Sequence, residues 1–212
     1  VLERSRVVNT LAPRRQLGVS LQTDLAAGQL RLAGGLFNGN GGGLHPNDND
    51  SFLYVGRVSG AIPLDAGQLA VGANVAYSQD EDVAVGSIMP SFAGQRGVIG
   101  LDARLRWRRW TLAAEGLTAR FDAANGPTTH PRGYYLMAGY HLAAHHQLLA
   151  RLDGFDSGQP AAKDDAAEDD TQMILGYGFA WTETVTMQLN YLASVEALDS
   201  GHVGVRLQLA LH

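Results

Sequence analysis

The feature that most constrains the fold of this chain is a regular alternation of apolar with polar or small residues. Alternation with a period of two is the pattern of a β-strand whose two faces meet different surroundings. In segment 202–211, for example, Val203, Val205 and Leu207 share one face while Arg206 lies on the other. Eleven segments of this kind predict strands at 16–24, 30–38, 52–61, 69–78, 98–107, 110–121, 133–142, 147–155, 171–181, 185–194 and 202–211.

The length of these segments separates a membrane barrel from a soluble β-sandwich, whose strands also alternate. Sandwich strands usually have about five or six residues, whereas a tilted barrel strand needs roughly nine to eleven to cross a bilayer. The predicted segments have the length of barrel strands. Short connectors at 25–29, 62–68, 108–109, 143–146 and 182–184 alternate with long ones at 39–51, 79–97, 122–132 and 156–170. Because outer-membrane barrels combine short periplasmic turns with long outer loops, the sequence predicts an all-β fold, an antiparallel transmembrane β-barrel in the bacterial outer membrane. We expect the apolar positions to face lipid and the polar ones to face the lumen: Leu69, Val71, Val75, Leu207 and Leu209 outside, and Gln188, Asn190, Arg206 and Gln208 inside.

Aromatic residues support the same prediction, because they sort by strand end. The tryptophans that border short turns are Trp107, Trp110 and Trp181, and the tyrosines near the long loops are Tyr54, Tyr77, Tyr134 and Tyr191. All fall on the apolar face. Aromatic side chains gather at the two water interfaces of a membrane barrel, so the placement predicts two girdles.

Composition excludes several other classes. No apolar run approaches the roughly 18 residues of a spanning helix. The chain has no cysteine, which removes disulfide frameworks and thiolate metal sites. Its 16 Lys+Arg against 21 Asp+Glu give a formal net charge of -5 without a basic run, so nucleic acid is not an expected partner.

Strand orientation predicts that the chain is one barrel domain over 1–212 that lacks its N-terminal strands. If the short turns are periplasmic, the last strand ends in the periplasm and the first of eleven begins at the outer surface. Bacterial single-chain barrels have an even strand number, so we expect an odd number of strands to precede Val1.

Several stretches resemble the phosphate-selective porins O and P. They are LAPRRQLGVSL, GGLFNGNGGG with NDNDSFLYVGRVSGAIPL, RGYYLMAGYHL, QLLARLDGFD, VTMQLNYLASV and VGVRLQLAL, in the same order along almost the whole chain. FNGNG and LYVGRV are the most distinctive. The resemblance implies a homotrimeric anion channel of about sixteen strands per subunit, embedded in lipid and lipopolysaccharide, with about five strands missing here. It also implies a constriction with lysines and an inward-folded loop, which we expect upstream of Val1. One departure is the end of the chain, which is His212 rather than an aromatic residue.

Arginines on the polar face are the candidate anion contacts of such a channel. They are Arg31, Arg57, Arg104, Arg106, Arg151 and Arg206. A guanidinium in a narrow aqueous pore attracts an anion and replaces part of its hydration. The alternative is that these arginines brace the wall by pairing with the acids of the same face, which are Asp24, Asp102, Glu115 and Asp153. Both interpretations stay open at this point.

Other chemistry has weaker support. His141, His145 and His146 surround a short turn but lack a metal-site spacing, and the acidic run that contains Lys163 does not match a calcium loop. We therefore expect no metal and no cofactor. A barrel enzyme, such as a lipase or protease, needs a nucleophile facing a base. The wall serines Ser20, Ser59 and Ser78 have no evident histidine partner. The sequence predicts a passive channel for small anions such as phosphate or polyphosphate, with a barrel enzyme or a non-conducting structural barrel as alternatives.

Overall fold

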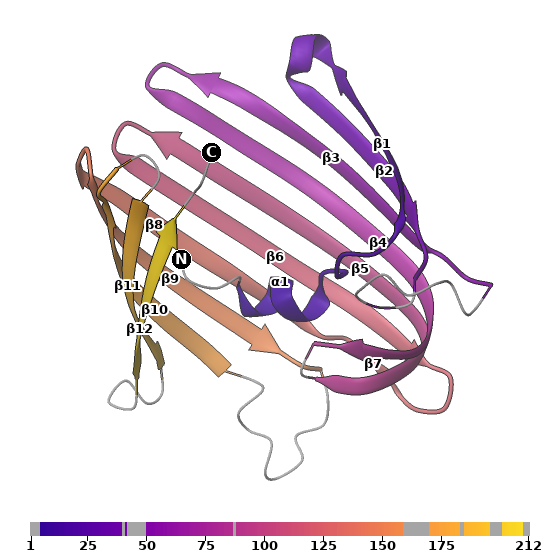
Figure 1. Ribbon diagram of the computed structural model, residues 1–212. Coiled ribbons are helices and arrows are strands. Elements are labelled where there is room, and N and C mark those ends of the chain that lie inside the picture. The colour runs from indigo at the N-terminus through magenta and orange to yellow at the C-terminus, as the bar shows by residue number, and fades with distance from the viewer. Residues whose placement is uncertain are drawn as a thin grey trace.

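The chain forms one antiparallel β-sheet that curves around a short helix (Figure 1). The computed structural model describes residues 5–39, 41, 50–86, 88–158, 170–182, 185–195 and 201–209, with backbone alone for 170 and 206–209. The first strands are β1 (Gly18–Leu25), β2 (Leu30–Phe37), β3 (Leu53–Leu64), β4 (Gly67–Val85), β5 (Met89–Trp107) and β6 (Trp110–Ala123). They are followed by β7 (Thr128–Thr129), β8 (Arg132–Ala143), β9 (His146–Asp156), β10 (Asp170–Ala180), β11 (Val185–Ser194) and β12 (His202–Leu209). The helices are α1 (Arg6–Leu11) and the single 3₁₀ turn η1 (Ala26–Gly28).

Each long strand pairs with its neighbour in the chain, and the two-residue β7 pairs only with β6. The prediction of an all-β antiparallel fold is confirmed: strands make up 76% of the described residues. β1 and β12 stand at the two edges of the sheet, and no pairing joins them within the described residues. Within that same part of the chain, no helix is long and apolar enough to cross a membrane.

Two strands are much longer than the sequence predicted. β4 and β5 continue through the expected loop 79–97, because Ser78 pairs with Arg96 and Asp80 with Gly94. The register shifts after Asp80, where Asp82 has a φ of 52°. A bulge of this kind bends a hairpin and increases its twist. The extended part of the β4–β5 hairpin therefore bends toward α1. Its close approach is evident at Gly86, where an added Cβ would meet Thr10 of α1.

The two faces of the sheet differ as predicted. On the outer face, which points away from α1, Val71 is 41% exposed and Val75 is 55% exposed, whereas Leu69 is only partly exposed. No second sheet covers this face among the described residues. Gln188 and Asn190 lie on the inner face, as expected. Leu207 and Leu209 were expected on the outer face, but their side chains are not among those described. Large exposed apolar surfaces of this kind mark sites of contact with another apolar surface.

The hydrophobic core lies between the inner face and α1. Ser5 caps the helix by accepting a hydrogen bond from the Val8 amide at 3.4 Å. Val7 and Leu11 are four residues apart, so they share one side of the helix, and both are fully buried. They belong to one cluster with Leu53, Ala76, Val85, Ile88, Phe92, Val98, Leu117, Ala119, Phe121 and Phe155. The core thus occupies the inside of the curve.

Candidate functional site

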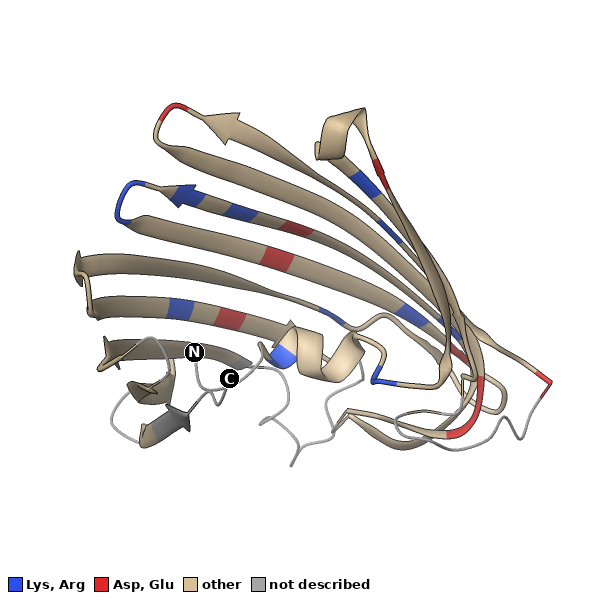
Figure 2. Ribbon diagram, turned by 45° about the horizontal axis from the view of Figure 1, so that its top comes forward, with Lys and Arg blue, Asp and Glu red and all other residues tan. Residues whose placement is uncertain are grey.

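Charged residues occur on several neighbouring strands of the part of the sheet that curves around α1 (Figure 2). Their backbone positions align across the strands: Asp102 pairs with Glu115, Glu115 with Tyr135, and Tyr135 with Asp153. Residues paired in this way point to the same side of the sheet. These four positions, together with Arg57 and Arg151, form what we call the inner belt.

The first ion pair of the belt spans an intervening strand. Arg57 on β3 donates two hydrogen bonds to Asp102 on β5, at 2.7 and 2.9 Å. The strand between them, β4, has Gly72 at this level, and a Cβ added there would collide with both side chains. The bidentate pair therefore depends on a glycine, because only the absence of a side chain lets the guanidinium and carboxylate meet.

In the centre of the belt, Glu115 accepts a hydrogen bond from the Tyr135 hydroxyl. Asp102 lies beside Glu115 in the β5–β6 ladder, so two carboxylates are neighbours here. Arg57 and Arg104 are the cations whose charge acts on this group. The centre of the belt is thus a mixed site in which neither sign dominates.

The second ion pair connects the belt to α1. Arg151 donates to Asp153 at 2.6 Å, and their side chains are 5% and 2% exposed. The Arg6 amide also donates to Asp153, at 3.5 Å. The Arg6 guanidinium lies 5.5 Å from the centre of the Phe155 ring. Because a buried carboxylate needs several donors, Asp153 helps to hold the start of α1 against β9.

The six predicted arginines divide into groups with different partners. Arg31 pairs with Asp24 at 2.6 Å, so Arg31, Arg57 and Arg151 all contact acids of the wall. Their positions match the bracing alternative, because a paired guanidinium has part of its donor capacity already used. The side chain of Arg206 lies outside the described residues.

Arg104 and Arg106 differ from the other arginines. Within the described part of the chain, neither forms a salt bridge, and Arg106 donates to the neutral Gln68 amide oxygen at 2.9 Å. Both lie on β5 between the belt and the short β5–β6 turn, and both are exposed. Of the five candidate arginines with described side chains, these two have the most capacity to contact a dissolved anion.

Two features were not predicted from the sequence: α1 and the apolar part of the inner wall. An inward-folded loop was expected upstream of Val1, whereas a helix of this chain lies on the inner face (Figure 1). The signal was present: Ser5 precedes apolar residues at Val7 and Leu11, a capped helix with one apolar side. A second signal was that β6 has apolar residues on both faces. Leu112 lies on the outer face, whereas Leu117 and Phe121 lie on the inner face.

The residues considered for a barrel enzyme or a metal site have other contacts in the structure. Ser78 is fully buried and accepts a hydrogen bond from Arg96 Nε at 3.3 Å. His146 Nδ1 lies 2.6 Å from the Tyr177 hydroxyl on the outer face. Among the residues with described positions, no group of three or more His, Cys, Asp or Glu is arranged to hold a metal. Lys163 falls outside the described residues.

Comparisons with models of known protein families and with curated protein sequences find no match for this chain.

Proposed function

We propose that this chain forms part of the wall of an outer-membrane β-barrel that conducts small anions. The observation that carries the proposal is the contrast between the faces, with exposed aliphatic side chains outside and Arg104 and Arg106 inside without a carboxylate partner. A sheet that is apolar outside and charged inside fits a barrel with lipid around it and water within it. The resemblance to the phosphate-selective porins supports the same function.

The proposal includes closure of the barrel by further strands. An open edge exposes unpaired backbone N–H and C=O groups, which are costly in a bilayer. β1 and β12 are such edges in the described sheet. A barrel of about sixteen strands, as in the porin family that the sequence resembles, pairs both edges.

Selectivity in this proposal comes from the local field near Arg104 and Arg106. The paired arginines contribute little net charge, because each lies within 3 Å of a carboxylate oxygen. Two guanidinium groups on the same face, two residues apart, offer an anion successive weak sites, and conduction requires sites that bind without trapping. The α1 helix narrows the passage at the level of the belt.

The test is the zero-current potential of the full-length channel in a planar bilayer under a tenfold chloride gradient. We expect anion selectivity in the unmodified channel and a clear loss of it in Arg104→Gln/Arg106→Gln. Arg120→Gln is the matched control, since Arg120 lies on the outer side of β6 and pairs with Asp122 at 2.8 Å. Replacing chloride by phosphate then measures phosphate preference.

The outcomes separate the competing functions. Cation selectivity in the unmodified channel, or a double variant that behaves like it, would exclude Arg104 and Arg106 as the source of selectivity. Membrane insertion without conductance would indicate a structural or enzymatic barrel instead.

A further inference from the structure

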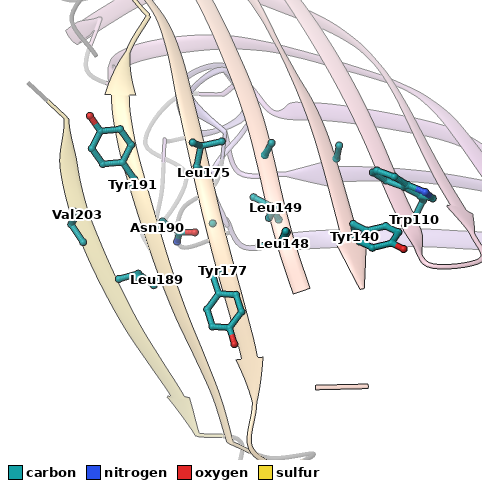
Figure 3. Close-up of a pocket in the computed structure, with 13 residues that line it drawn as sticks. Trp110, Tyr140, Leu148, Leu149, Leu175, Tyr177, Leu189, Asn190, Tyr191 and Val203 are labelled. Atoms are coloured by element: carbon teal, nitrogen blue, oxygen red, sulfur yellow. The ribbon is translucent and has the colours of Figure 1, made fainter. Parts of the chain in front are cut away.

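An apolar groove of about 770 Å³ crosses the outer face over β6 and β8–β12 (Figure 3). Its lining includes Ala138 and Ala150, which are direct neighbours on β8 and β9. Larger side chains surround these alanines: Trp110, Tyr140, Leu148, Leu175, Tyr177 and Leu189. The volume lies in the range of about 300–1,000 Å³ that is typical of small-ligand sites. The groove can therefore hold a flexible hydrocarbon chain.

The end of the groove nearest the short turns has amphipathic side chains. The Trp110 and Tyr140 rings pack with their centres 4.7 Å apart. The Tyr177 hydroxyl is 2.6 Å from His146 Nδ1. Side chains with an apolar body and a polar tip favour the level of lipid headgroups. This end of the groove thus has the chemistry of a membrane interface.

Two arginines occupy the turn beside this end. The Arg108 guanidinium lies 4.9 Å from the centre of the outward-facing Trp107 ring. Arg109 donates to the Leu142 carbonyl at 3.4 Å, which brings it next to the β8–β9 turn with exposed His145. The sequence has no Asp or Glu between Asp102 and Glu115, and none from 123 to 152. Positive charge at this rim has no acidic partner from either turn.

We propose that this surface binds an anionic phospholipid, with its phosphate at Arg108 and Arg109 and an acyl chain in the groove. Arginine matches phosphate oxygens with several planar donors, and a basic cluster beside an apolar surface attracts anionic lipids. The charge lies at one end only of an otherwise apolar groove, which matches the charged headgroup and the apolar chain of a lipid. The proposal rests on the proposed membrane location of the sheet.

The experiment measures quenching of tryptophan fluorescence by brominated phospholipids in vesicles that contain the full-length protein. Trp107, Trp110 and Trp181, the three tryptophans of the chain, lie at the short-turn end of their strands. Brominated phosphatidylglycerol and phosphatidylethanolamine, each in an unbrominated background of the other, give their relative binding constants. We expect a preference for phosphatidylglycerol at low salt that falls about five-fold for each arginine lost in Arg108→Gln/Arg109→Gln.

Control variants make the result specific. Arg120→Gln, at the opposite end of β6, should leave the preference unchanged. Ala138→Leu/Ala150→Leu fills the groove and should reduce the number of phospholipids retained after detergent extraction, counted by native mass spectrometry, while conductance stays the same. Equal binding of both lipids by the unmodified protein, or an unchanged preference after loss of both arginines, would overturn the lipid site alone. Absence of quenching by either lipid would instead overturn the membrane location.

Discussion

Replacing Leu11 by alanine should release α1 from the inner face and, in the proposed channel, widen the passage. Leu11 is fully buried, and only Val7 beside it is anchored as deeply on the apolar side of the helix. Burial of two such side chains stabilises the docked helix by about 3 to 6 kcal/mol before the cost of ordering the segment. Leu→Ala substitutions in cores cost about 2 to 5 kcal/mol. The loss is therefore comparable with the whole docking energy.

A helix of six residues has no stability of its own in water, so the undocked segment should unfold. We expect Leu11→Ala to increase single-channel conductance and current noise, and to speed hydrogen exchange at the amides of α1 while the exchange of the β-strands stays the same. Asn9→Ala is the matched control, because Asn9 is exposed on the same helix. If Leu11→Ala conducts and exchanges like the unmodified protein, α1 is held by something other than its apolar side.

Two further substitutions test the ion pairs. Gly72→Ala places a Cβ between Arg57 and Asp102, so their contact should break, and the free energy of unfolding should fall by about 1 kcal/mol because the pair is partly exposed. The zero-current potential of the proposed channel should stay close to its unmodified value, because breaking the pair frees one positive and one negative charge on the same face. An unchanged free energy of unfolding would indicate that the pair re-forms around the new methyl group. Asp80→Ala leaves the Arg96 guanidinium, 3.0 Å from Asp80 Oδ2 and 7% exposed, as a buried charge without this carboxylate. The free energy of unfolding in urea should fall by about 3 to 5 kcal/mol, and a loss under 1 kcal/mol would show that water reaches the pair.

Strand positions and the character of the two faces followed from the sequence, because alternation is a local property of the chain. Each predicted segment overlaps a long strand of the sheet, and Val71 and Val75 lie outside as expected. The exceptions were extensions at strand ends. Residues 79–97 read as a loop because Asp and Gly are frequent there, yet ladder hydrogen bonds and the Asp80–Arg96 contact keep them paired.

The position of Arg57, Arg104, Arg106 and Arg151 on the inner face also followed from the sequence, since it depends only on their place in the alternation. Arg96 was missed, because its segment was expected to be a loop. The tertiary structure decided which of them find a carboxylate. Arg57 and Asp102 are 45 residues apart and meet across a third strand because the register places Gly72 between them. Register and packing over such separations depend on the whole sheet. The same holds for α1, whose buried Val7 and Leu11 gain a packing surface only when Leu117, Phe121 and Phe155 are brought together by folding.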